Sequence, residues 1–280
     1  MKDFLINFTA FFASLIVGSA IGFWLSRGFE TETPTDIERV EIIRIIDVIG
    51  DNAKFDLPPK IEGKPIIAEY NDTQPEKNNL VWVSSFHSGD FPYKNNSRWL
   101  GLFKEGDRFV VKPTRLRVKE ISDPDLYDLD VTTSEGGESI FLFRDLPNIK
   151  VSEVPTVFLE SDDDMVDTSL KPGSQRITFN GVPYSLTLNN PISGEYPGKG
   201  STLTLAANGK EQVLRFLPDG CNDCAWTLIW AGDLDSDGRL DLFMDLTDHY
   251  NIIDRVLFLS GDAAADKLVK FSANFSSTGC

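Results

Sequence analysis

Residues 226–246 read Trp226-Thr-Leu-Ile-Trp-Ala-Gly-Asp-Leu-Asp-Ser-Asp-Gly-Arg-Leu-Asp-Leu-Phe-Met-Asp-Leu246. Both ends of this stretch are apolar, and their large side chains recur at every second position, which is the period of a β-strand. The middle is acidic and contains a glycine, which is typical of a tight loop. The stretch therefore predicts two strands, Trp226–Trp230 and Leu240–Leu246, joined by an acidic loop.

The acidic loop has the spacing of an oxygen-ligand site for a hard cation. Carboxylates stand at its first, third, fifth and ninth positions, and a glycine stands at the sixth, as in the front of an EF-hand loop. A doubly charged cation would turn the mutual repulsion of these carboxylates into coordination. We therefore expect a Ca²⁺ site made by four side chains and one backbone carbonyl, from Asp233, Asp235, Asp237, Asp241 and, through its carbonyl oxygen, Arg239. The rival interpretation is an acidic surface turn that binds no ion.

The loop is EF-hand-like only at its front. An ordinary EF-hand requires a bidentate glutamate at the twelfth position, where this chain has Met244. Asp245 lies four residues beyond Asp241, about 13 Å further along an extended strand, so it cannot reach the same ion. What remains is a calcium loop that joins two strands, with water completing the coordination shell.

A resemblance to a known family is carried by Ala231-Gly-Asp-Leu-Asp-Ser-Asp-Gly-Arg-Leu-Asp-Leu242. This stretch resembles the calcium loop of FG-GAP repeats, the integrin-type or VCBS-type modules of extracellular proteins in bacteria and animals. The resemblance implies a calcium loop between strands. Such repeats normally form arrays that build propeller blades, and this chain has one copy, so the propeller fold is not implied. The wider stretch from the loop to Cys280 is similar to uncharacterised secreted bacterial proteins, which implies a location but no activity.

The amino terminus carries the second strong signal. Phe4–Ser26 contains no charged residue, and as a helix it would span about 34 Å, enough for a bilayer core of about 30 Å. We therefore expect residues 1–27 to form an N-terminal transmembrane helix. The alternative is a cleaved signal peptide, because Gly18-Ser-Ala20 has the small-x-small pattern of a cleavage site. The apolar run continues past this pattern to Trp24 and Leu25, which favours a retained anchor.

The anchor sets the expected location and partners. A short amino terminus followed by a large acidic remainder is most simply inserted with its carboxy-terminal part outside the cytoplasm, in the periplasm or at the cell surface. Signal cleavage would instead give a secreted protein. Calcium is abundant outside the cytoplasm, where sites with dissociation constants of about 10⁻⁴ to 10⁻³ M are useful. The expected partners are the membrane, a protein or glycan of the cell envelope, and a second copy in a weak homodimer through Ser14, Gly18 and Gly22.

The charge of the chain excludes one class of partner. The sequence has 27 basic and 43 acidic residues, and its net charge is −16. A nucleic-acid-binding protein needs a basic surface, so we expect no nucleic-acid partner.

Beyond the anchor, the sequence predicts an all-β fold, a mostly antiparallel sandwich or barrel. Residues 28–75 are expected to form a stalk, 76–172 a β-rich region, and 173–280 a C-terminal β domain with the calcium loop. Besides the two strands around the loop, the predicted strands are Leu80–Ser84, Trp99–Phe103, Arg108–Lys112, Leu116–Ile121, Ser139–Arg144, Pro155–Leu159, Arg176–Phe179, Tyr184–Leu188, Thr202–Ala206, Gln212–Phe216, Arg255–Leu259 and Val269–Ala273. Asn180-Gly181 and Asn208-Gly209 predict two-residue hairpin turns.

Three cysteines are present: Cys221, Cys224 and Cys280. Zinc requires four ligands, and the chain has only two histidines, both distant in sequence. A redox pair normally stands at a helix start that lowers the thiol pKa, whereas Cys221 and Cys224 stand in an acidic loop before a strand. We expect one structural disulfide between Cys221 and Cys280, and Cys221–Cys224 is the chief alternative.

The sequence favours a non-enzymatic function. We expect a membrane-anchored, extracytoplasmic calcium-binding β domain with a structural or interaction role at the cell envelope. The main alternative is a hydrolase of envelope glycans or esters that uses Asp248 and His249, the one place where a histidine neighbours a carboxylate. A thiol oxidoreductase that uses Cys221 and Cys224 is the third hypothesis. The sequence contains no Gly-x-Ser-x-Gly elbow, phosphate loop or metal-binding histidine pair.

Overall fold

The computed structural model describes residues 66–71, 79–121, 127–160, 168–192, 194–221 and 224–278. The predicted anchor over residues 1–27 and nearly all of the predicted stalk lie outside these ranges. Among the described residues, no helix is long and apolar enough to cross a membrane.

The described residues form fifteen strands, and neighbouring strands pair in antiparallel fashion throughout. The prediction of an all-β, antiparallel fold is therefore confirmed. The strands are β1 (Leu80–Val81), β2 (Ser84–Phe86), β3 (Arg98–Glu105), β4 (Arg108–Glu120), β5 (Leu129–Thr133), β6 (Glu138–Phe143), β7 (Thr156–Leu159), β8 (Gly173–Phe179), β9 (Val182–Asn189), β10 (Ser201–Ala207), β11 (Lys210–Leu217), β12 (Thr227–Gly232), β13 (Asp241–Asp245), β14 (Ile252–Leu259) and β15 (Lys270–Thr278).

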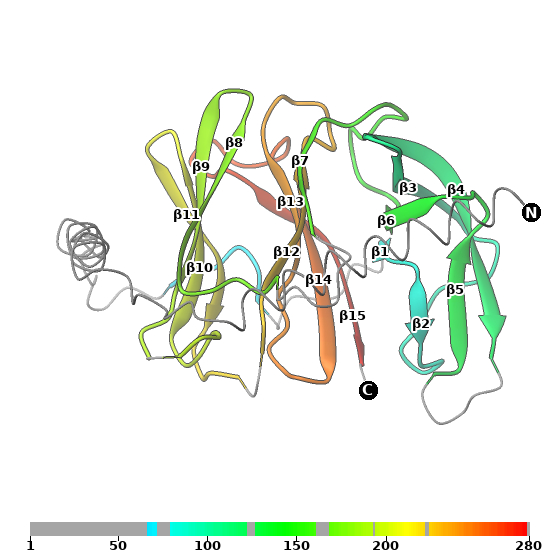
Figure 1. Ribbon diagram of the computed structural model, residues 1–280, viewed down its shortest axis with the longest axis horizontal. Coiled ribbons are helices and arrows are strands. Elements are labelled where there is room, and N and C mark those ends of the chain that lie inside the picture. The colour runs from blue at the N-terminus through cyan, green and yellow to red at the C-terminus, as the bar shows by residue number, and fades with distance from the viewer. Residues whose placement is uncertain are drawn as a thin grey trace, which may run out of the picture. The chain divides into compact units, whose positions relative to one another are not determined.

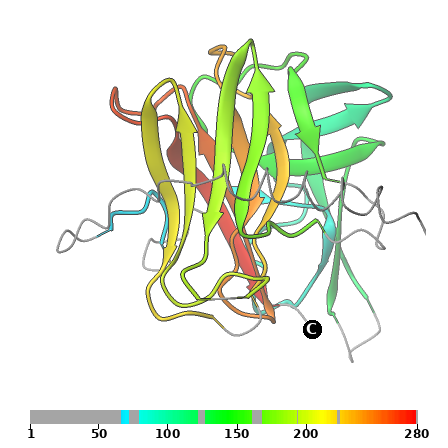
Figure 2. The same cartoon turned by 60° about the vertical axis from the view of Figure 1, so that its left-hand side comes forward.

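The strands make three sheets (Figure 1). The six-stranded sheet has the order β1-β6-β3-β4-β5-β2, and the four-stranded sheet has the order β11-β10-β9-β8. The third sheet, with the order β15-β14-β13-β12-β7, lies between them and is called the central sheet below. Figure 2 shows the four-stranded sheet, coloured yellow to light green, in front of the central sheet.

The central sheet is buried on both faces. Leu242 and Met244 of β13 pack into the core shared with the four-stranded sheet, whereas Phe243 between them packs into the core shared with the six-stranded sheet. In β14, Val256 and Leu257 divide between the two cores in the same way. Because successive side chains of a strand point to opposite faces, a run of apolar residues can serve both cores.

The two Asn-Gly turns have the predicted geometry. Asn180 and Gly181 link β8 to β9 with φ values of 47° and 76°, and Asn208 and Gly209 link β10 to β11 with 51° and 73°. Positive φ at both central residues is the signature of the type I′ hairpin turn, which matches the twist of the flanking strands. Both hairpin predictions are therefore confirmed.

The strands differ from the predicted pattern at three places. The predicted strand Leu80–Ser84 is divided between β1 and β2, which pair with β6 and β5 respectively. The segments predicted at Arg108–Lys112 and Leu116–Ile121 belong to one strand, β4, which continues through Pro113. Proline is tolerated there because the stretch before Leu116 pairs with β3 on one side, and β5 joins the other side only from Leu116 onward. β5 was not among the predicted strands.

The predicted division of the β structure at residues 172 and 173 falls within one packed unit. The described residues from 66 to 278 belong to a single structural unit. The core on one side of the central sheet combines residues from the predicted β-rich region, such as Phe141, with residues such as Phe243 and Phe275 from the predicted C-terminal domain. The same unit also includes β7, which pairs with β12.

Cys221 is bonded to Cys224, so the structure corrects the pairing that we expected from the sequence. Their Cα atoms lie 5.8 Å apart, within the range that a disulfide spans without backbone movement. Both sulfur atoms also lie close to the Pro197 carbonyl oxygen, at 3.3 and 3.5 Å. A cysteine forms one disulfide, so Cys221 is not available to Cys280, which lies outside the described residues.

The corrected pairing predicts a modest effect on stability. We expect Cys221→Ser to lower the free energy of unfolding by about 2 kcal/mol, because the closed loop is very short and chain-entropy estimates grow with its length. Thermal melts under oxidising conditions measure this loss, and Cys280→Ser is the control that should melt like the wild type. Alkylation before reduction should label Cys280 alone. Labelling of Cys224 with protection of Cys280 would contradict the pairing.

Candidate metal centre

The loop between β12 and β13, residues 233–241 counted to the first residue of β13, is called the metal loop below. Its entry is fixed by Gly232, where a Cβ atom would collide with the carbonyl oxygen of Pro155. That same oxygen accepts a hydrogen bond of 2.9 Å from the amide of Asp233. Within the loop, Ser236 and Gly238 have positive φ values of 63° and 83°, which turn the chain sharply twice. These constraints bring successive carboxylates to the same side of the loop.

Three of the four predicted carboxylates come together. Ligand oxygens of Asp233, Asp235 and Asp237 all lie within 4.8 Å of one another. Asp233 is buried, and its two oxygens accept hydrogen bonds of 3.0 Å from the amides of Asp237 and Gly238. The loop thus wraps around its first residue, as a cation-binding loop must do to present several oxygens to one ion.

Asp235 is the carboxylate whose surroundings most favour a cation. Its side chain is 8% exposed, and its Oδ1 atom is buried with no hydrogen-bond partner. Its Oδ2 atom accepts a hydrogen bond of 2.9 Å from the amide of Gly261, where a Cβ atom would collide with the carboxylate. Burial raises the pKa of Asp235 to about 6, and the charge of Asp237 contributes in the same direction. A buried carboxylate oxygen without a donor is costly, so a cation beside it would be strongly favoured.

Asp241, the fourth predicted carboxylate, is fully buried and fastens the loop to the turn after β14. One of its oxygens accepts hydrogen bonds from the amides of Leu234 and Asp235, at 2.7 and 3.4 Å. The other accepts from the amide and hydroxyl of Ser260, at 2.7 and 2.8 Å. Burial, followed by the charge of Asp235, holds the pKa of Asp241 well above its usual range. The structure therefore gives Asp241 a framework role beside the three clustered carboxylates.

Arg239 enters the site through its side chain, which the sequence interpretation did not anticipate. Its Nε and Nη2 atoms lie 2.8 and 2.6 Å from Oδ2 of Asp237, and Nη2 donates to the Ser260 carbonyl oxygen at 2.5 Å. The guanidinium thus neutralises part of the acidic cluster. That the Arg239 carbonyl is a ligand stays a prediction.

Several residues around the loop were not predicted. Ser260 and Gly261 lie in the turn between β14 and β15, and Asn180 lies in the turn between β8 and β9. All are distant from the loop in sequence, so no local spacing could reveal them. The only available signal was the turn-forming character of Ser-Gly and Asn-Gly dipeptides, which indicates a turn but not its neighbour.

The residues of the hydrolase hypothesis have other neighbours. The carboxylate of Asp248 lies 3.9 Å from Nη2 of the buried Arg215. The ring of His249 stacks on Tyr250 at 4.5 Å, and its Nδ1 atom accepts from the amide of Asn251. The hydrolase hypothesis stays a prediction.

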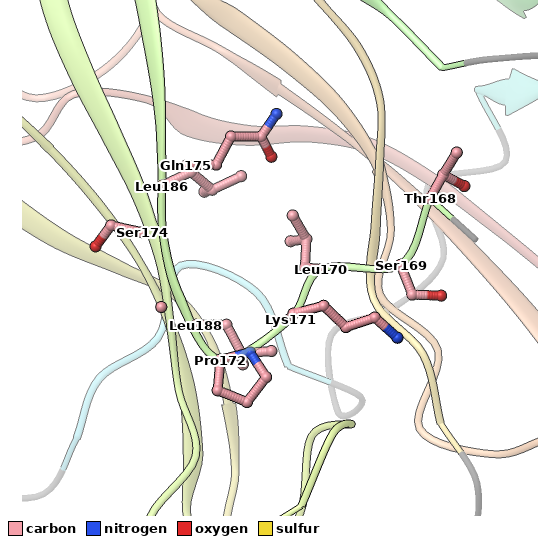
Figure 3. A pocket seen from close by; sticks show the side chains of 10 residues that line it. Thr168, Ser169, Leu170, Lys171, Pro172, Ser174, Gln175, Leu186 and Leu188 are labelled. Atoms are coloured by element: carbon pink, nitrogen blue, oxygen red, sulfur yellow. The ribbon is translucent and has the colours of Figure 1, made fainter. Parts of the chain in front are cut away.

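A cavity of about 280 Å³ lies apart from the metal loop (Figure 3). Its walls come from the segment that leads into β8 and from β8 and β9, and they include Leu170, Leu186 and Leu188. Lys171 lines it as well, and its ammonium group lies 3.0 Å from Glu195 and 4.2 Å from the ring centre of Tyr196. The cavity shares no lining residue with the carboxylate cluster.

Comparison of the chain with protein-family models, curated proteins and solved structures gives no match. The geometry of the loop and of the sheets around it is therefore the basis for a function.

Proposed function

We propose that this protein is a calcium-binding β protein of the cell envelope, in which a bound ion fixes the metal loop between strands β12 and β13. The observation that carries the proposal is the buried, unpartnered oxygen of Asp235 within a cluster of three carboxylates. A cation there would satisfy that oxygen and screen the repulsion among Asp233, Asp235 and Asp237. The protein would have a structural role or bind a partner at the cell envelope, and no catalytic step is proposed.

The donor set favours Ca²⁺ over other biological cations. The three clustered ligands are carboxylates, whereas structural zinc sites use cysteine and histidine. Calcium accepts six to eight oxygens in flexible geometry, so waters and a backbone carbonyl would complete its shell. Magnesium demands near-ideal octahedral geometry and usually keeps several waters, which suits an irregular loop of this kind less well. The resemblance of residues 231–242 to the FG-GAP calcium loop supports the same choice.

The Arg239 side chain argues for a weak site. Calcium would compete with a guanidinium that already contacts Asp237, and this competition lowers the net affinity. We infer a dissociation constant of about 10⁻⁴ to 10⁻³ M, the range of extracellular modules. Such a site would be filled where free calcium exceeds this constant, as it can outside the cytoplasm.

The proposed location follows from the sequence. The uncharged run Phe4–Ser26 would anchor the chain in the membrane, with the β structure outside the cytoplasm. The Cys221–Cys224 disulfide supports an oxidising compartment. The partner we propose is a protein or glycan of the envelope, and a weak homodimer through the anchor is a further proposal.

Calcium should stabilise the protein measurably. At about 10 mM free Ca²⁺ and a dissociation constant of about 10⁻⁴ M, the tight end of the proposed range, the linkage amounts to about 2.7 kcal/mol. For a folded region of this size we expect the melting temperature to rise by about 5–10 °C. Scanning calorimetry of the full chain, in chelator and in about 10 mM Ca²⁺, measures the rise, and Mg²⁺ at the same concentration should give less.

Matched variants separate the site from general charge effects. Asp235→Asn should abolish most of the calcium-dependent rise because it removes one ligand charge. Asp266→Asn makes the same charge change at an exposed position in the β14–β15 turn and should keep the full rise. An equal rise in Asp235→Asn and the wild type, or no rise in the wild type, would refute the metal assignment.

A further inference from the structure

We infer that Asn180, in the turn between β8 and β9, positions the metal loop, so that calcium binding is coupled to the packing of the four-stranded sheet on the central sheet. The inference rests on the proposed calcium site. It adds a positioning residue that lies outside the sequence motif of the ligands. It also extends the effect of the ion to a second sheet.

The first observation is a hydrogen bond across 58 positions of sequence. The amide group of Asn180 donates through Nδ2 to the carbonyl oxygen of Gly238 at 3.0 Å. Gly238 is the sixth residue of the loop, and its own amide donates to the candidate ligand Asp233 at 3.0 Å. Both backbone groups of this glycine are therefore held, one by a ligand and the other by the neighbouring sheet.

The peptide unit that follows transmits the constraint to a second ligand. The Gly238 carbonyl and the Arg239 amide belong to one planar group, so fixing the direction of one fixes the other. The Arg239 amide donates to Oδ1 of Asp237 at 2.8 Å. Asn180 thus orients a peptide whose opposite end holds one of the three clustered carboxylates.

A second contact comes from the same hairpin. The hydroxyl of Tyr184 in β9 accepts a hydrogen bond of 3.4 Å from the amide of Leu240. Tyr184 is buried in the core between the two sheets. The β8–β9 hairpin therefore contacts the metal loop on both sides of Arg239, at Gly238 and at Leu240.

The presence of asparagine at position 180 has a simpler explanation, its preference for this turn type, and the test must distinguish that explanation from a role at the metal loop. Asparagine and glycine are the preferred residues of a type I′ turn, so Asn180 would be favoured without any role at the loop. Asn208 provides the matched case, because it occupies the same position of the same turn type with a φ of 51°. No hydrogen bond between Asn208 and the metal loop is found among the described residues.

Two glycine variants separate the side-chain amide from the backbone conformation. Glycine adopts positive φ without strain, so Asn180→Gly and Asn208→Gly both keep their turns. We expect Asn180→Gly to weaken calcium binding by the full chain about 3- to 10-fold, the equivalent of one lost hydrogen bond. Asn208→Gly should bind calcium like the wild type. Titration calorimetry with CaCl₂ measures both.

Hydrogen exchange tests the coupling directly. Calcium should slow amide exchange at Gly181 and Val182 in the wild type, and this protection should be lost in Asn180→Gly while Gly261 stays protected. If Asn180→Gly fails to fold, Tyr184→Phe is the second variant. It should also weaken calcium binding, because it removes the acceptor of the Leu240 amide. Wild-type affinity in the folded Asn180 variant, or no calcium effect at Gly181 and Val182, would overturn the inference alone. A wild-type chain that binds no calcium would overturn the proposed function as well.

Discussion

Asp241→Ala should lower the free energy of unfolding by about 3–5 kcal/mol, because it removes the acceptors of several buried donors at once. Asp241 is fully buried and accepts hydrogen bonds from three backbone amides and one hydroxyl. The alanine variant leaves the amides of Leu234 and Ser260 buried without partners. Urea unfolding in the presence of a chelator measures the loss without any contribution from calcium.

The isosteric variant Asp241→Asn separates the effect of the lost hydrogen bonds from the effect of the lost charge. Asp241→Asn keeps one acceptor oxygen and should lose about half as much stability as Asp241→Ala. A calcium-free loss below about 1 kcal/mol in Asp241→Ala would show that these hydrogen bonds contribute little. Asp241 would then be a metal ligand that stabilises the loop only when calcium is bound.

Without calcium, the stability of the protein should fall as the pH rises from about 5 to about 8. Burial raises the pKa of Asp245 to about 7, although Arg255 opposes the shift, and burial raises that of Asp235 to about 6. In the unfolded chain both groups titrate near 3.9. Between these values the folded state holds protons that the unfolded state has lost, so each step upward in pH favours unfolding. For Asp245 alone the loss between pH 5 and pH 8 is at most about 3 kcal/mol. Asp241, whose pKa is also raised by burial, contributes to the same fall.

Two interventions should remove the parts due to Asp245 and Asp235 separately. Asp245→Asn mimics the protonated carboxyl and retains an oxygen for the amide of Thr247, so it should remove the part of the fall that ends near pH 7. Calcium should remove the part due to Asp235, because a bound cation stabilises its charged form. Urea midpoints at pH 5 and pH 8 measure both effects. A calcium-free stability that is constant or rises over this range would contradict the raised pKa values.

Much of the fold could be predicted from the sequence because strand periodicity and turn chemistry are local signals. The Asn-Gly turns required only two residues, and the strands around the metal loop required only alternating apolar side chains. The strand β4 was divided in the prediction because Pro113 is a strong local breaker, and only its place beside β3 explains why it is accepted. Local patterns also could not assign Phe243 to a second core, since that depends on a sheet formed by distant residues.

The candidate site could likewise be predicted only where its residues lie within one short stretch of sequence. The spacing of Asp233, Asp235 and Asp237 identified the clustered carboxylates, since their proximity follows from one short loop. The framework role of Asp241 depends on Ser260, which belongs to another hairpin. The same holds for the disulfide, because three cysteines allow several pairings and the sequence alone does not choose among them.

Because the central sheet is buried on both faces, we expect the three sheets to unfold as a single cooperative unit. Met244 and Phe243 are adjacent in β13, yet they serve different cores, so neither core is complete without strands that the other also requires. Removal of either outer sheet would expose an apolar sheet face, at a cost of about 25 cal/mol for each Å² returned to water, and create a surface prone to aggregation. The stability of each outer sheet thus depends on the other, because both pack on the central sheet. A lineage carrying this fold would therefore have to inherit all three sheets together.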